Sequence, residues 1–277
     1  MRNAVNAPRN RITQGTIFFG VKSPYEHCLT CYGISITARC DTAHNFKAPS
    51  LTFLPVVSME EWLWYDILPR CIEEQIKSSI SGLRSHLIDK LGTSIVLDAF
   101  GVEVGFSSID ISNKGIKKHH DNYREALGSQ KLSAFEWDNL PKSIINKLSS
   151  EAKELLKGKN QNYYFIESVE CSFGTGSQNP KCGFVVILRD IRTISRDLAL
   201  EVMTGIDQER LNLLATHNPT AYQLFIDDDG FCYPTGELTS PFIEQLMQSF
   251  SLLFGRIGTK DVPELYVNEI LKLLGSK

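Results

Sequence analysis

The spacing of apolar residues in this sequence changes at one point, directly after Val57, from the period of a strand to the period of a helix. Before this point, the runs "ITQGTIFFGV", "CYGISIT" and "SLTFLPVV" are short and rich in β-branched or aromatic residues, which is typical of strands. After it, apolar residues recur three or four positions apart from Ile72 to Leu91, as on one face of a helix. The chain therefore contains strand-rich and helical parts, so we expect an α+β fold.

Local signals predict where the first helical part begins and ends. Ser58 and Glu61 have the spacing of a capping box, in which each residue satisfies a backbone N–H of the other. Pro69 is expected to end or kink the helix that opens there. Beyond it, the apolar stripe continues until Gly92, a residue that commonly ends helices.

The remaining elements are predicted from the same periods. "TSIVLDAFGVEV" is interpreted as a strand pair, or a strand and a loop, and an amphipathic helix is expected after Pro141. "NYYFIESVE" and "GFVVILRDI" predict a hairpin within residues 161–191, and "YQLFI" and "FCYPT" predict a second hairpin around the turn at Asp229. Two C-terminal helices are expected, one after Ser240-Pro241 and one from Asp261.

Two or three short strands cannot bury a core alone, so we expect the two strand-rich regions to pair with each other. We predict a composite β-barrel domain from residues 1–58 and 159–200, with residues 59–158 as a helical insertion. Residues 201–277 are predicted to form a hairpin and helices that pack on the barrel. The expected core residues are Ile17, Phe19, Ile34, Ile36, Phe53, Val186, Phe242, Leu246, Phe250 and Leu253.

Composition excludes few classes of protein. The net charge is −3 and 22% of residues are charged, so the surface as a whole lacks the basic character of a nucleic-acid-binding protein. No apolar run approaches the roughly 18 residues of a membrane span, and the N-terminal stretch has no apolar segment typical of a secretion signal. The chain has seven cysteines, an odd number. We therefore expect a reduced cytoplasmic protein without a cofactor.

A cluster of soft metal ligands lies in the N-terminal part. Cys28, Cys31, Cys40 and His44 together offer a set that tetrahedral zinc accepts, and Cys40 with His44 is also a candidate nucleophile and base. Only the Cys28–Cys31 end has the spacing of a zinc knuckle, and no catalytic signature surrounds Cys40. We therefore favour buried thiols, with Cys40 and Asp41 at the rim of a barrel strand and Asp41 as its cap.

A second polar cluster comprises Lys117, Lys118, His119 and His120. Its simplest interpretation is a solvated charged face, and the alternative is contact with a partner or with phosphate. The chain has no Gly-rich phosphate loop, HExxH or GxSxG motif. No catalytic constellation therefore stands out.

Two stretches together resemble a group of bacterial proteins: "ITQGTIF…YGISITARCD" and "TSPFIEQLMQSFSLLFGRIG". In that group, an opening Gln-Gly-x-hydrophobic strand leads to a strand ending in Cys-Asp. The C-terminal helix of the group reads Ser-Pro-aromatic, then Phe, then Arg-hydrophobic-Gly. The resemblance implies an accessory component of a bacterial phage-defence or other conflict system.

The N-terminal part is also distantly similar to the PemK/MazF toxin barrel, a family that cleaves RNA. Pro55 and Ser58 in "FLPVVS" match the end of a strand in that family, and Asn45 matches its loop. The resemblance implies a small SH3-like or PemK-like barrel and, if the activity is retained, a site of Arg39, His44 and Ser58. The Arg-Pro that opens the family's strand is absent here, and a ribonuclease needs a cation at the developing phosphorane charge.

The first functional hypothesis is a non-catalytic interaction or regulatory protein that docks a protein partner through its amphipathic helices. A PemK-like endoribonuclease is the alternative, and a nucleic-acid-binding module is a weaker one. We expect no contact with a membrane.

Overall fold

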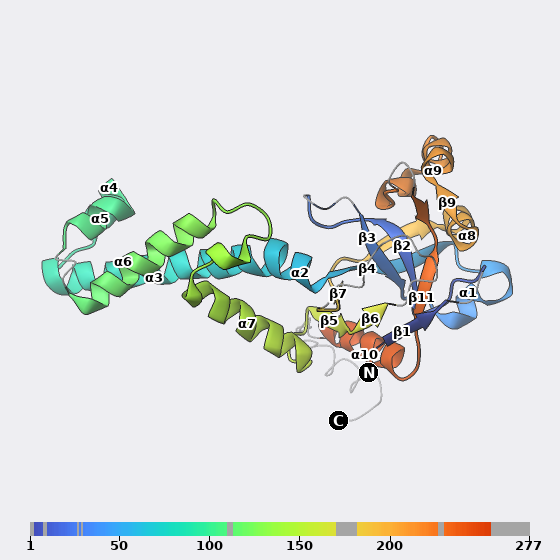
Figure 1. Cartoon of the computed structure of the whole chain (residues 1–277), viewed down its shortest axis with the longest axis horizontal. Coiled ribbons are helices and arrows are strands. Elements are labelled where there is room, and N and C mark those ends of the chain that lie inside the picture. The colour runs from blue at the N-terminus through green and yellow to red at the C-terminus, as the bar shows by residue number, and fades with distance from the viewer. Residues whose placement is uncertain are drawn as a thin grey trace, which may run out of the picture.

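The computed structural model describes residues 3–7, 10–26, 28, 30–109, 113–169, 182–226 and 230–255. A barrel-like sheet forms one end of the molecule, and a long helical arm (residues 59–129) extends from it (Figure 1). The expected α+β class and barrel-like sheet are confirmed. An SH3-like or PemK-like architecture stays a prediction.

The main sheet is nearly closed into a barrel. Its strand order is β5-β7-β4-β3-β2-β11-β1-β6, and β8 pairs with β4. Only Glu167 separates β5 from β6, so one stretch of chain supplies both ends of this order. The strands are β1 (Asn3–Asn6), β2 (Thr16–Lys22), β3 (Thr30–Ser35), β4 (Ser50–Ser58), β5 (Tyr163–Ile166), β6 (Ser168–Val169), β7 (Phe184–Ile187), β8 (Arg192–Ser195) and β11 (Pro234–Leu238).

The pairing expected between the two strand-rich regions is present. β4 and β7 are antiparallel, with Val56 opposite Val186. The division of the chain into domains stays a prediction. The C-terminal region contributes more than packing, because β11 is itself a strand of the sheet and lies between β2 and β1.

The second predicted hairpin is wrong in its partner strand. β10 (Phe231–Cys232) pairs with β9 (Ile206–Asp207) instead of "YQLFI". The first two residues of that run, Tyr222 and Gln223, belong to a 3-10 helix, η3 (Pro219–Gln223), and Leu224 forms an isolated antiparallel bridge with Val21 of β2. The 3-10 helix begins where the Asn218 side chain accepts a hydrogen bond from the Thr220 N–H at 3.1 Å. The turn at Asp229 and the helix expected from Asp261 lie outside the described residues, as does the tip of the first hairpin, residues 170–181.

The arm begins as predicted. The Ser58 Oγ accepts from the Glu61 N–H at 3.1 Å, and the Glu61 Oε2 accepts from the Ser58 N–H at 2.8 Å. The helix then runs through α2 (Met59–Glu61), a π-helix η1 (Trp62–Ile67) and α3 (Leu68–Leu91). Pro69 does not end it: Pro69 lies just after η1, where the hydrogen-bond pattern of the helix changes from that of a π-helix to that of an α-helix. Gly92 ends α3 in the left-handed region, with φ at 74°.

The strand pair predicted for "TSIVLDAFGVEV" is wrong: this stretch forms α4 (Ile95–Phe100) and α5 (Val102–Ser107). Leu97 and Phe106 are buried together with Leu83 of α3. Burial against the long helix therefore outweighs the local preference of β-branched residues for strands. The arm continues with α6 (Lys114–Ser129), and η2 (Trp137–Asn139) and α7 (Lys142–Leu156) lead back to the sheet.

The strand predicted to end at Cys40 and Asp41 is shorter than expected. It ends at Ser35, and both residues lie in the first turn of α1 (Arg39–Phe46). The Asp41 N–H donates to the Ala38 carbonyl oxygen at 3.0 Å, which begins the helix. Asp41 is therefore a first-turn helix residue, a favourable place for a carboxylate, and caps no strand.

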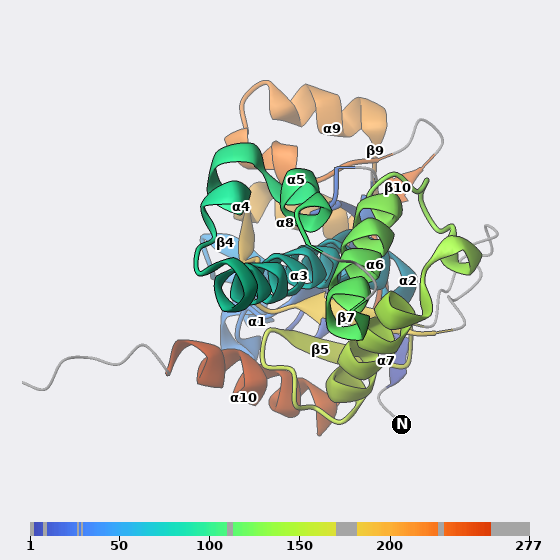
Figure 2. The ribbon, with the colours of Figure 1, turned by 90° about the vertical axis from the view of Figure 1, so that its left-hand side faces the viewer.

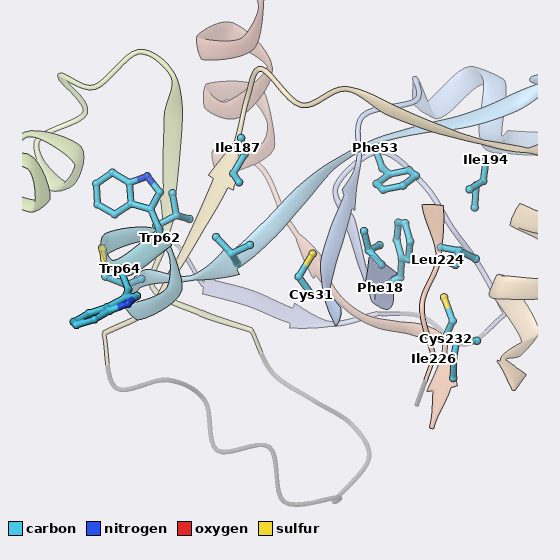
Figure 3. Close-up of a cluster of buried hydrophobic side chains, with 14 of the residues drawn as sticks. Phe18, Cys31, Phe53, Trp62, Trp64, Ile187, Ile194, Leu224, Ile226 and Cys232 are labelled. Atoms are coloured by element: carbon cyan, nitrogen blue, oxygen red, sulfur yellow. The ribbon is translucent and has the colours of Figure 1, made fainter. Parts of the chain in front are cut away.

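Besides the small core of the arm, the core around the sheet has two parts, one on each face. Figure 3 shows the first, where Phe18, Cys31 and Phe53 of the sheet lie in one cluster with Trp62 and Trp64 of η1. The second lies under α10 (Phe242–Phe254). Of the expected core residues, Ile17, Ile34, Ile36, Phe53, Val186 and Leu246 are buried, while Phe19, Phe242, Phe250 and Leu253 are half-buried and pack on the second part.

Two further helices, α8 (Arg196–Thr204) and α9 (Gln208–Ala215), complete the described chain. In the described ranges, no helix combines the length and the apolar character that crossing a bilayer requires.

Candidate interaction site

The predicted zinc ligands are spread over the N-terminal part of the barrel. Cys31 is buried on β3, Cys28 precedes this strand, and Cys40 is exposed on α1 beyond its other end. The four residue steps of strand from Cys31 to Ser35 span about 13 Å, whereas zinc binds sulfur at about 2.3 Å. The described residues contain no group of three or more metal-binding side chains. Burial raises the pKa of the Cys31 thiol, as expected for a thiol that acts as a core residue.

The ribonuclease candidates are divided between the two ends of β4. Arg39 and His44 belong to α1, which lies near the first end, where the Ala48 N–H donates to the Asp41 carbonyl oxygen at 3.1 Å. Ser58 is at the other end of a strand about 26 Å long. Its hydroxyl is engaged with the Glu61 carboxylate at 2.8 Å. Ser58 is thus a helix cap.

The basic cluster on α6 also separates into two parts. Lys117 and Lys118 are exposed, whereas His119 and His120 are half-buried. The His119 ring lies over Gly82 of α3, and the His120 ring contacts Phe106 at 5.1 Å between centroids. The histidines pack the arm together, and the two lysines face solvent.

The largest group of exposed apolar side chains on the arm lies at its far end. We define the distal patch as Ile88, Leu91, Ile95, Phe100 and Val104. Phe100 is 70% exposed and Ile95 is 63% exposed, and the other three are about half exposed. α4 and α5, which carry three of these residues, form the end of the molecule farthest from the barrel (Figure 1). These exposed apolar side chains make the far end of the arm the candidate interaction site.

The helices that carry the distal patch are fixed in place. Leu83, Leu87 and Leu97 belong to a small core at this end of the arm. Arg84 of α3 pairs with Asp98 of α4 at 2.6 Å, and this hydrogen bond lowers the pKa of the Asp98 carboxyl. The apolar side chains are therefore presented on an ordered surface.

A hydrogen-bonded cluster joins the base of the arm to the barrel. The Asp66 carboxylate of η1 accepts from the Tyr163 hydroxyl at 2.7 Å and from the Tyr25 hydroxyl at 3.4 Å. Arg70 pairs with the same carboxylate at 3.4 Å, and the Trp62 ring meets the Tyr163 ring edge-on. We call Tyr25, Trp62, Asp66, Arg70 and Tyr163 the base cluster. Through it, two barrel tyrosines fix the first turns of the arm.

The base cluster predicts a loss of stability at alkaline pH. Burial, and then the Asp66 charge, raises the pKa of the Tyr25 phenol, and burial with the Asp66 hydrogen bond does the same for Tyr163. Burial also raises the pKa of the nearby Cys28 thiol from 9.0 to about 12. Each group is neutral in the folded chain at a pH where the unfolded chain releases its proton, so stability is lost as pH rises above about 9–10.

Urea unfolding at pH 8, 9, 10 and 11 measures this loss. Tyr25→Phe should flatten the decline between pH 10 and 11, because the variant lacks one phenol with a raised pKa. Tyr222→Phe is the control, since Tyr222 is 68% exposed. If the unfolding free energy of Tyr25→Phe fell with pH as steeply as that of the parent protein, the raised pKa of Tyr25 would not be a cause of the alkaline loss of stability.

Comparison with known proteins found no relative of this chain: no family model, no curated protein and no solved structure matches it.

The distal patch was missed in the sequence because Ile95, Phe100 and Val104 were assigned to strands, and because Leu91 was assigned to the apolar face of the long helix although it is 50% exposed. The sequence did contain one indication of the patch. Apolar residues on both sides of Gly101 are too numerous for all of them to lie on the single buried face of each short helix, so some must be exposed.

Proposed function

We propose that this chain is a non-catalytic interaction protein that presents the distal patch to a protein partner. The observation that carries the proposal is the exposure of Phe100 and Ile95 at the far end of the arm. Fully burying an apolar side chain of this size contributes about 1.5–3 kcal/mol. Two such residues supply the energetic centre of a small interface.

The shape of the arm supports the same proposal. The patch lies beyond the barrel, so a partner can reach it without contacting the sheet (Figure 1). Lys117 and Lys118 are exposed on the same arm, where lysines add electrostatic attraction to an acidic partner surface. The setting in a bacterial phage-defence or other conflict system is part of the proposal and rests on the sequence resemblance alone.

Photo-crosslinking in cells of the native host tests this function. A photoreactive phenylalanine analogue at position 100 of the full chain should give a discrete crosslinked product. Adding Ile95→Glu should reduce its yield about tenfold, because a charge in an apolar contact costs more than 1.4 kcal/mol. The same analogue at Tyr222, which is equally exposed but lies on the barrel side, should not give this product. The same product from both positions, or none from position 100, would refute the proposal.

A further inference from the structure

One edge of the sheet carries backbone groups without a partner strand. In the described sheet, β5 pairs only with β7. The Leu188 N–H donates to the Asn162 carbonyl oxygen at 3.0 Å, and bonded positions alternate along an antiparallel pair. Tyr164 and Ile166 therefore exchange bonds with β7. The N–H and C=O groups of Tyr163 and Phe165 point to the opposite side.

These outward backbone groups have no backbone hydrogen bond to any part of the chain that the structure describes. Beside them is a cleft of about 300 Å³, which is lined by Tyr163, Tyr164 and Phe165. Its other walls come from the residues that follow α7 and from α10, which lie on either side of β5 (Figures 1 and 2). The cleft therefore runs along an unpaired strand edge.

No charged residue lines the cleft, and the side chains that face β5 from α10 and from beyond α7 are mostly polar. α10 contributes the side chains of Gln245, Gln248 and Ser249, and Asn160 faces them from beyond α7. The Gln245 and Gln248 amides make no hydrogen bond within the described residues, and each offers both donors and acceptors. A neutral mixture of donors and acceptors does not select an anion or a cation. It matches the alternating N–H and C=O groups of an extended polypeptide.

We propose that this cleft binds an extended segment of a partner protein, which adds to the barrel as a strand along β5. The backbone groups of Tyr163 and Phe165 would bond to the added strand, as in other complexes formed by strand addition. The amides of Gln245 and Gln248 contact the face of the segment that points toward α10. This surface lies on the barrel and is independent of the distal patch.

A matched pair of variants at one position tests the backbone contact. Random 12-residue peptides displayed on phage are selected on the full chain, and the enriched peptides are synthesised. Phe165→Ala and Phe165→Pro both lose the ring, but only proline removes the outward N–H, and the bonds to β7 do not use that N–H. The peptides should bind Phe165→Ala within about threefold of the parent protein and Phe165→Pro at least about tenfold more weakly.

Hydrogen exchange of the parent protein keeps the test decisive if Phe165→Pro does not fold. A selected peptide should slow exchange of the Tyr163 and Phe165 amides and leave those of α9 unchanged. The proposal is overturned if no peptide is enriched, if Phe165→Pro binds as well as Phe165→Ala, or if protection appears elsewhere. Displacement of the selected peptides by a synthetic copy of residues 256–277 would assign the cleft to this chain's own C-terminal segment, and would overturn the choice of a partner protein.

Discussion

Replacing Trp62 by alanine should lower the free energy of unfolding by about 3–5 kcal/mol. Trp62 is fully buried in the first part of the core, where η1 meets the barrel. Its ring also lies 5.2 Å from the ring of Tyr163, centroid to centroid. The substitution leaves a cavity where the first turns of the arm pack into the barrel core. Urea unfolding monitored by circular dichroism gives the loss directly.

Trp137→Ala is the matched control, because Trp137 is also a tryptophan near the arm base but is only half-buried. We expect this variant to lose less than half as much stability, since less apolar surface is uncovered. Similar losses for the two variants would show that Trp62 does not join the arm to the barrel core.

Gly20→Ala should lower the free energy of unfolding by about 2–5 kcal/mol, through backbone strain and a steric clash together. Gly20 lies at the irregular position of β2 between Phe19 and Val21, with φ at 94°. An added Cβ would stand 2.6 Å from the Cβ of Cys232 and 2.9 Å from its Cα. Because a backbone atom is among the contacts, the clash cannot be relieved by a side-chain rotation.

Gly92→Ala separates the two causes. Gly92 also has a positive φ, at 74°, but an added Cβ would meet nothing within 4 Å. This variant should lose only the strain of about 1–2 kcal/mol. If Gly20→Ala were no more destabilised than Gly92→Ala in the same urea series, the result would contradict the close contact between Gly20 and Cys232.

The features that local sequence predicted are those decided by neighbouring residues. The capping box of Ser58 and Glu61 and the stop at Gly92 depend on side chains within one turn of a helix end. The strands around Ile34 and Val186 have apolar, β-branched runs that favour strands, and these residues are buried in the sheet. For these elements, the sequence pattern and the tertiary contacts favour the same conformation.

The features that the local sequence did not predict depend on contacts between residues far apart in the chain. β11 joins β2 across most of the chain, and the Thr235 hydroxyl donates to the Ile17 carbonyl oxygen at 3.2 Å. α4 formed as a helix because Leu97 packs against α3. The distal patch and the free edge of β5 are surfaces, so they are defined by what the rest of the fold leaves uncovered, and a linear pattern does not contain this information.

Because the arm is long, a small change of angle at its base moves the distal patch by a large distance. α3 has 24 residues and is therefore about 36 Å long, so a rotation of about 10° at η1 moves its far end by about 6 Å. The angle at η1 is held by two phenolic hydroxyls on one carboxylate, that of Asp66. Loss of the Asp66 hydrogen bonds to Tyr25 and Tyr163 would therefore enlarge the range of positions that Phe100 can occupy relative to the barrel. The direction in which the arm presents Phe100 is thus set at its base, one helix length away from the patch itself.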